Sequence, residues 1–149
     1  MARPFPLQTV LELMQARADE ATQQLARLIA SERDAKSKLE LLQQYRDEYA
    51  TRFRDASQRG LSQIQWQNYQ DFLDRLDEAI DQQRRTVAQQ ERNTASGQIN
   101  WQQQRKNLKA FDTLSDRHFS RENARELKRE QKAQDEFAAR SKDDNAKSR

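Results

Sequence analysis

Apolar side chains recur with a seven-residue period through the first third of the chain. Alternate steps of four and three residues from Leu7 to Ala56 visit fifteen positions, and thirteen of them are apolar. Only Glu32 and Arg46 break the series. Such a repeat is typical of a helix that packs against another helix as a coiled coil. It predicts a helix over about residues 6–57. The positions are Leu7, Leu11, Met14, Ala18, Ala21, Leu25, Leu28, Glu32, Ala35, Leu39, Leu42, Arg46, Tyr49, Phe53 and Ala56.

A second repeat of the same kind follows. It has fourteen positions, of which nine are apolar, and it is weakest between Gln83 and Gln104. It predicts a second helix over about residues 63–139. The positions are Trp66, Tyr69, Leu73, Leu76, Ile80, Gln83, Val87, Gln90, Thr94, Gly97, Trp101, Gln104, Leu108 and Phe111.

A turn separates the two repeats. Gly60 can adopt the left-handed conformation that ends a helix. Ser62 followed by Gln65 forms a capping box, which starts a new helix. These signals predict a turn over residues 58–62. Because the connection is so short, the two helices are expected to be antiparallel.

The two repeats stay in step along their whole length when the helices are antiparallel. Facing positions then have residue numbers that add up to about 122, so that Phe53 faces Tyr69. The large Trp101 falls opposite the small Ala21. This agreement favours a hairpin over two unrelated helices.

The composition suits an elongated fold better than a globular one. Apolar residues make up 34% of the chain and charged residues another 34%, whereas a compact domain needs a larger apolar share. A coiled coil buries only about two positions in seven. We therefore expect an all-α fold in which residues 1–149 form one antiparallel two-helix hairpin. The polar C-terminal tail, about residues 140–149, is expected to be disordered.

Residues that could perform chemistry are scarce. The chain has no cysteine, which fits a reducing cytoplasm, and His118 is its single histidine. Its two glycines, Gly60 and Gly97, are too far apart to form a phosphate-binding loop. No apolar run approaches the roughly 20 residues of a membrane span. We expect no catalytic site, no bound metal and no cofactor, and hence no enzyme.

The basic charge is also too balanced to predict nucleic-acid binding. The formal net charge is +3, from 27 basic and 24 acidic residues. From residue 121 onward nine Lys or Arg accompany seven Asp or Glu. A groove that follows a phosphate backbone needs a larger excess. The chain is therefore expected not to bind nucleic acid.

Two aromatic residues lie outside the seam. Tyr45 and Phe72 both occupy heptad position g, and in an antiparallel pair the two g positions flank the same side. One interpretation is that they thicken the edge of the core. The other is that they form an exposed apolar strip, with seam residues beneath, that binds a partner.

Three segments of the chain resemble the FliJ family of flagellar type III export proteins. They are LLQQYRDEYATRF (residues 41–53), the run from Trp66 to Ile80, and the ending DEFAAR (residues 135–140). The resemblance extends over nearly the whole chain. It implies a hairpin similar to the central stalk, the gamma subunit, of rotary ATP synthases.

The resemblance also implies partners. FliJ-like proteins bind the export ATPase FliI, promote assembly of its ring, and link the ring to the export gate FlhA. They escort empty export chaperones, and the regulator FliH belongs to the same machinery. The implied location is the cytoplasm, in peripheral association with the membrane-embedded export apparatus. Flagellum biogenesis and motility are the implied processes.

The resemblance assigns residues to two of these contacts. Lys38 and Gln83 stand where the family more often has glutamine and histidine at the edges of the gate-binding strip. The strip itself comprises Leu42, Tyr45, Tyr49, Phe72, Leu76 and Ala79. The implied ATPase contact, at the base of the hairpin, comprises Leu11, Met14, Ala18, Ala21, Phe111, Leu127 and Phe137.

Two other functions remain open at this stage. One is the equivalent stalk protein of a virulence type III secretion system, where the same architecture recurs. The other is a structural coiled coil with no specific binding strip. The flagellar-like segments beside the turn argue against the virulence role.

Overall fold

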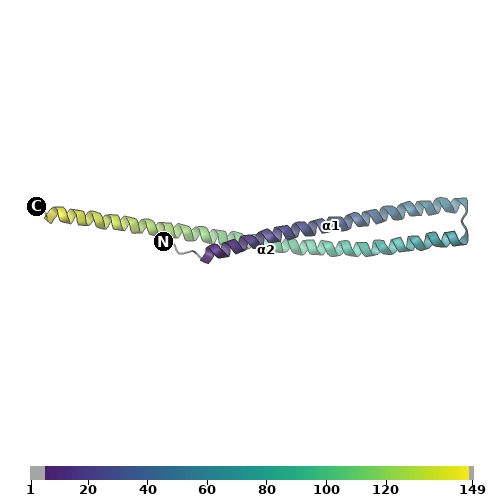
Figure 1. Ribbon diagram of the computed structural model, residues 1–149, viewed down its shortest axis with the longest axis horizontal. Helices are drawn as coiled ribbons and strands as arrows, with labels where there is room; N and C mark the ends of the chain where they lie inside the picture. The colour runs from purple at the N-terminus through teal and green to yellow at the C-terminus, as the bar shows by residue number, and fades with distance from the viewer. Residues whose placement is uncertain (1–5, 148–149) are drawn as a thin grey trace. The chain divides into compact units, whose positions relative to one another are not determined.

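The computed structural model describes residues 6–147, which form two long helices joined by a tight turn (Figure 1). Helix α1 spans Pro6–Arg59 and helix α2 spans Gln63–Lys147. The two helices pack against each other as a helical hairpin, so the all-α prediction is confirmed. The predicted helix boundaries near the turn, 57 and 63, differ from the observed ones by two residues or fewer.

The chain divides into two compact units. Residues 18–104 form what we call the hairpin unit, which contains the turn. Residues 1–17 together with 105–149 form the terminal unit, of which residues 6–17 and 105–147 are described.

The turn has the backbone geometry that the sequence predicts. Gly60 has a φ of 98°, a backbone conformation that residues other than glycine rarely adopt. The Gly60 N–H donates to the Ser57 carbonyl at 3.3 Å. The Ser62 N–H donates to Gln65 Oε1, and the Gln65 N–H donates to Ser62 Oγ, both at 3.2 Å. These two reciprocal bonds are the predicted capping box. They satisfy two backbone donors at the start of α2.

The predicted seams are the buried faces of the helices. All fifteen α1 positions and every α2 position except Trp66 are buried or half-buried. Alternate four- and three-residue spacing keeps these side chains on one stripe of each helix. The most deeply buried apolar members are Ala18, Ala21, Ala35, Leu73, Leu76, Ile80 and Val87.

Hydrogen bonds between the helices fix the register of the hairpin unit. Thr94 Oγ1 donates to the Leu28 carbonyl at 3.3 Å, and these two residue numbers add up to 122. Trp101 Nε1 donates to Thr22 Oγ1 at 3.0 Å, one residue from the expected facing position. Phe53 packs on Tyr69 with ring centroids 5.4 Å apart. The predicted pairing is therefore confirmed.

Polar seam residues are satisfied rather than left unpaired. Gln83 Nε2 donates to the Ala35 carbonyl at 3.0 Å, across the weak stretch of the second repeat. Gly97 lets the helices approach closely, because a Cβ atom there would lie 2.5 Å from Leu28 Cδ1. The weak stretch thus adds small residues and side-chain-to-backbone bonds to the apolar contacts of Val87 and Trp101.

In the terminal unit the helix pair ends before α2 does. Leu11 and Met14 are half-buried, as is Phe111, and Ser115 is only 3% exposed. From Phe119 to Lys147 every α2 side chain is exposed.

The disordered tail expected over residues 140–149 differs from the structure. Residues 140–147 continue α2, and residues 148–149 lie outside the described part of the chain. The absence of glycine and proline after Gly97 explains how the helix extends past the predicted end at 139.

Substituting Gly60 tests the turn. Gly60→Ala should lower the free energy of unfolding by about 1 kcal/mol, because alanine is strained at positive φ although its Cβ would meet no atom within 4 Å. Gly60→Asn should cost less, since asparagine tolerates this conformation better. Urea denaturation followed by circular dichroism measures both. Equal stability of the wild type and the alanine variant would contradict the turn geometry.

Substituting Gln90 tests the weak stretch. Gln90 is half-buried on the seam, so Gln90→Leu should raise the free energy of unfolding by roughly 1 kcal/mol. Gln82→Leu, at an exposed position, is the control and should bring no gain. A similar response of both variants in thermal melts would mean that position 90 is not a core layer.

Candidate protein-binding surface

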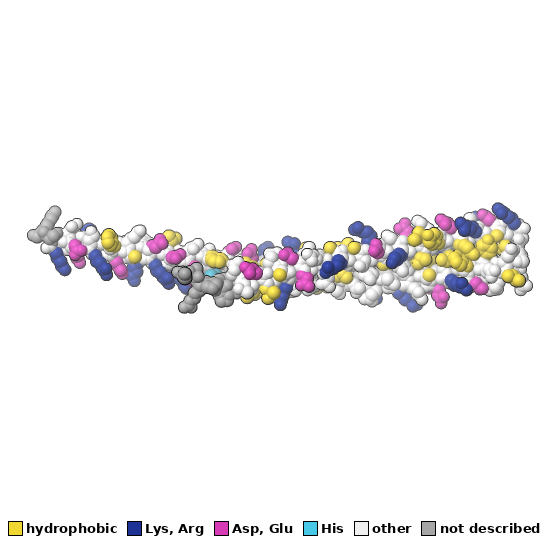
Figure 2. Space-filling view, in the orientation of Figure 1, with side chains coloured by type: hydrophobic (Ala, Val, Ile, Leu, Met, Phe, Trp, Pro, Cys, Tyr) yellow, Lys and Arg dark blue, Asp and Glu magenta, His cyan; other side chains and the backbone are white. Residues whose placement is uncertain are grey.

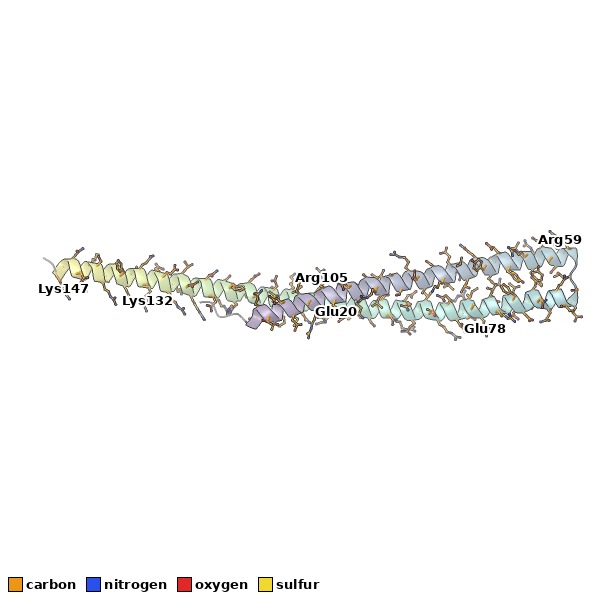
Figure 3. The ribbon with its side chains drawn as sticks, in the orientation of Figure 1. Glu20, Arg59, Glu78, Arg105, Lys132 and Lys147 are labelled. Carbon is orange, nitrogen blue, oxygen red and sulfur yellow. The ribbon has the colours of Figure 1, made fainter. Side chains whose placement is uncertain are left out.

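Aromatic rings from both helices form a ladder beside the turn. Tyr49 lies 4.3 Å from Phe72 and 5.2 Å from Tyr69, measured between ring centroids. Phe53 lies 5.4 Å from Tyr69 and 6.4 Å from Trp66. The rings are tilted against one another, as the charge distribution of aromatic rings favours. The ladder stiffens this part of the hairpin, and Figure 3 shows side chains filling the space between the helices near Arg59.

The predicted strip is partly exposed. Tyr45 is 51% exposed and Phe72 is 42% exposed, which are high values for large aromatic side chains. Tyr49 and Leu42 are half-buried beneath them. Figure 2 shows hydrophobic side chains gathered on one face of the hairpin unit, close to the turn. A patch of this kind favours protein binding over simple solvation.

Not every strip residue is available to a partner. Leu76 is 9% exposed and belongs to the core, while Ala79 is half-buried. Phe72 has a double role because its ring also packs closely on Tyr49. Tyr45 is therefore the strip residue that contributes least to folding and most to the free surface.

Trp66 extends the exposed aromatic surface toward the turn. Its side chain is 46% exposed, although the repeat places it on the seam. It is the fourth residue of α2, so no earlier helical turn covers its ring. The repeat alone does not predict this exposure, but the position of Trp66 close to the start of α2 indicates it.

The opposite flank of the hairpin unit is charged. Arg46 Nε donates to Asp77 Oδ1 at 2.8 Å. This hydrogen bond and the negative charge of Asp77 raise the pKa of the Arg46 guanidinium above its already high ordinary value. An open groove of about 550 Å³ lies here, and its lining includes Gln43, Arg46, Asp77, Asp81 and Arg84. The two flanks of the seam thus differ in chemistry.

The residues expected to contact the ATPase belong to both units and differ in exposure. Ala18 and Ala21 are 5% and 4% exposed and pack within the hairpin unit. The other members belong to the terminal unit, where Leu127 and Phe137 are 66% and 75% exposed. The buried alanines can act only through packing, so any direct contact depends on the exposed members.

Groups that could support chemistry are sparse in the part of the chain that the structure describes. No cluster of three His, Asp or Glu side chains there is arranged to hold a metal ion. His118 is half-buried, with its ring 6.2 Å from that of Phe119. Within residues 6–147, neither helix contains a stretch apolar enough to cross a bilayer.

Comparisons with known proteins agree with this architecture. A family model described as "Flagellar FliJ protein" matches residues 3–147. The flagellar FliJ protein of Salmonella typhi is 29% identical over 140 residues, which cover 94% of this chain and 95% of the relative. The flagellar FliJ protein of Escherichia coli (strain K12) is 28% identical over the same length and with the same coverage.

Fold and surface together define a helical hairpin that pairs its helices through an apolar seam and leaves one aromatic flank open. The comparisons then identify the family. The chain belongs to the flagellar FliJ protein family, and it is accordingly a component of the flagellar export apparatus.

The strip and the core should respond differently to truncation. Leu73→Ala removes a buried seam residue and should cost about 2–5 kcal/mol of unfolding free energy. Tyr45→Ala should cost less than about 1 kcal/mol because the side chain is half exposed. Phe72→Ala should fall between them, since it also loses the ring contact with Tyr49. Urea denaturation ranks the three, and a Tyr45→Ala loss as large as that of Leu73→Ala would place Tyr45 in the core.

Proposed function

We propose that this chain is a non-enzymatic linker within the flagellar export apparatus, which binds the export ATPase FliI and connects the ATPase ring to the export gate FlhA. The observation behind the proposal is the exposed aromatic strip formed by Tyr45 and Phe72 over Tyr49 and Leu42. Interface aromatics commonly contribute most of the binding free energy at such patches. The strip binds the gate.

The remaining partners follow from the family resemblance. The chain promotes assembly of the ATPase ring in the manner of a stalk, acts alongside the regulator FliH, and escorts empty export chaperones. It works in the cytoplasm, in peripheral association with the membrane-embedded gate. The two long paired helices support this proposal, because the family resemblance implies a hairpin similar to the stalk of rotary ATP synthases.

A non-enzymatic role agrees with the chemistry of the surface. Two grooves on the hairpin unit are open and lined mainly by amides and by charged side chains of both signs. A catalytic pocket usually encloses its substrate and excludes water. These open grooves support binding as the proposed activity.

Gate binding is tested with purified variants and the cytoplasmic part of the gate. Tyr45→Ala and Phe72→Ala should each weaken binding by roughly 2 kcal/mol, or about thirtyfold in Kd, while the hairpin stays folded. Ile29→Ala is the matched control, because Ile29 is 42% exposed in the same unit but lies outside the strip. Isothermal titration calorimetry supplies the affinities and a thermal melt confirms folding.

Two outcomes would count against the proposal. Folded Tyr45 and Phe72 variants that bind the gate like the wild type would remove the strip from the interface. Wild-type protein that binds neither the gate nor FliI would favour a purely structural coiled coil. Binding to the ATPase and gate of a virulence secretion system, but not to the flagellar ones, would favour the sibling role.

A further inference from the structure

The buried stripe of α1 carries two charged residues, and both lie in the hairpin unit. Glu32 and Arg46 are the exceptions among fifteen seam positions that are otherwise apolar. Each is half-buried, with 22% and 40% of its side chain exposed. Both occupy heptad position a, and every d position of α1 is apolar. Charged side chains at such positions weaken apolar packing, but they can decide which helix is accepted as a partner.

Both charges are compensated in the hairpin by contacts that reach α2. Arg46 Nε donates to Asp77 Oδ1 at 2.8 Å, so the guanidinium meets a carboxylate on the facing helix. Glu32 Oε2 lies 3.4 Å from Lys36 Nζ, and Lys36 Nζ lies 3.8 Å from Glu91 Oε1 of α2. The hairpin therefore supplies an α2 carboxylate near each of the two interruptions.

The stripe of α1 could also pair with the same stripe of a second copy. It is apolar at thirteen of fifteen positions, whereas the α2 repeat is apolar at only nine of fourteen. Apolar burial alone would therefore favour two α1 helices side by side. The short turn favours α2 through its high local concentration. That advantage is missing while the chain is being synthesised, because α1 is complete before α2 exists.

A parallel pair of α1 helices would bring like charges together. In a parallel coiled coil each a residue faces the same residue of the other helix. The two Glu32 side chains would face each other, and two heptads further on so would the two Arg46 side chains. Inside a seam, where water screens charges poorly, both layers would be repulsive.

An antiparallel pair of α1 helices would leave Arg46 without a carboxylate. Position a then lies against position d, and full overlap of the helices requires facing numbers that add up to about 67. Arg46 would lie against Ala21 of the second copy, where the neighbouring flank positions are Arg17, Thr22 and Gln24. A partly buried guanidinium without a counter-charge is unfavourable.

We infer that Glu32 and Arg46 select the partner of α1: they direct its stripe to α2 of the same chain and exclude the α1 helix of a second copy. The hairpin offsets their charge through Asp77 and Glu91, which a pair of α1 helices does not contain. The selection matters for the surface of the protein as well. The exposed aromatic strip takes side chains from both helices, so it exists only when α1 and α2 pair.

Removing the two charges tests the inference in the full chain. The variant Glu32→Leu, Arg46→Leu makes the α1 stripe apolar at all fifteen positions. The matched control, Gln83→Leu, Gln90→Leu, makes two half-buried α2 seam positions apolar and keeps the α1 charges. Sedimentation equilibrium measures the association state of each protein at increasing concentration, and circular dichroism confirms that each is helical.

The α1 variant should form dimers at concentrations on the order of tenfold or more below any at which the wild type forms them, because two repulsive layers are gone. The control should associate no more than the wild type. An α1 variant that stays as monomeric as the wild type, or a control that dimerises equally, would overturn the inference.

A cysteine probe identifies which helices pair in the dimers. The chain has no cysteine, so Leu39→Cys, at the a position midway between Glu32 and Arg46, supplies a single thiol. A short bis-maleimide should join two copies of the α1 variant, since position 39 faces itself in a parallel α1 pair. Wild type and control should stay unjoined. Dimers that form without this crosslink would mean that the copies exchange α2, and the inference would fail.

An exchanged ion pair separates partner selection from simple stabilisation. Arg46→Asp combined with Asp77→Arg keeps opposite charges on the facing helices of the hairpin. In a parallel α1 pair the residues at position 46 would still carry like charges. This variant should therefore be as helical and as monomeric as the wild type. Dimerisation of the exchanged variant to the extent of the Glu32→Leu, Arg46→Leu variant would contradict selection by charge.

Discussion

Apolar burial along one stripe of each helix is the interaction on which the rest of the molecule depends. Neither α1 nor α2 has enough apolar surface for a globular core, and each buries its stripe only against the other. The turn at Gly60 brings α2 back alongside α1, so the two helices pair in antiparallel orientation. Once the apolar stripe of each helix is buried, the remaining positions lie either beside the seam or on the outer face of the helix. The function of the protein then depends on which side chains these exposed faces carry.

The fold was predictable because a coiled coil encodes its geometry in simple spacing. Phe53 against Tyr69 and Thr94 against Leu28 follow from counting residues out from the turn. The capping box at Ser62 was equally predictable from the sequence, since it depends on two side chains three residues apart. Exposure was harder to predict. Trp66 is on the seam yet half exposed, because coverage at a helix end depends on neighbours that are absent there.

The binding surfaces were less predictable, for a physical reason. Aromatic residues at position g can pack or protrude, and only side-chain placement showed that Tyr45 protrudes while Phe72 does both. Helix beyond residue 139 was missed because polar composition indicates disorder, although each residue there is compatible with a helix.

We propose that the two flanks of the hairpin unit have different functions: the apolar flank binds the export gate, and the charged flank faces water. Photo-crosslinking tests this most directly. A benzophenone amino acid is placed either at Tyr45 or at Asp81, an exposed residue in the charged groove. The account predicts a crosslink to the gate from position 45 and none from position 81. Equal crosslinking from both positions, or crosslinking from position 81 alone, would contradict it.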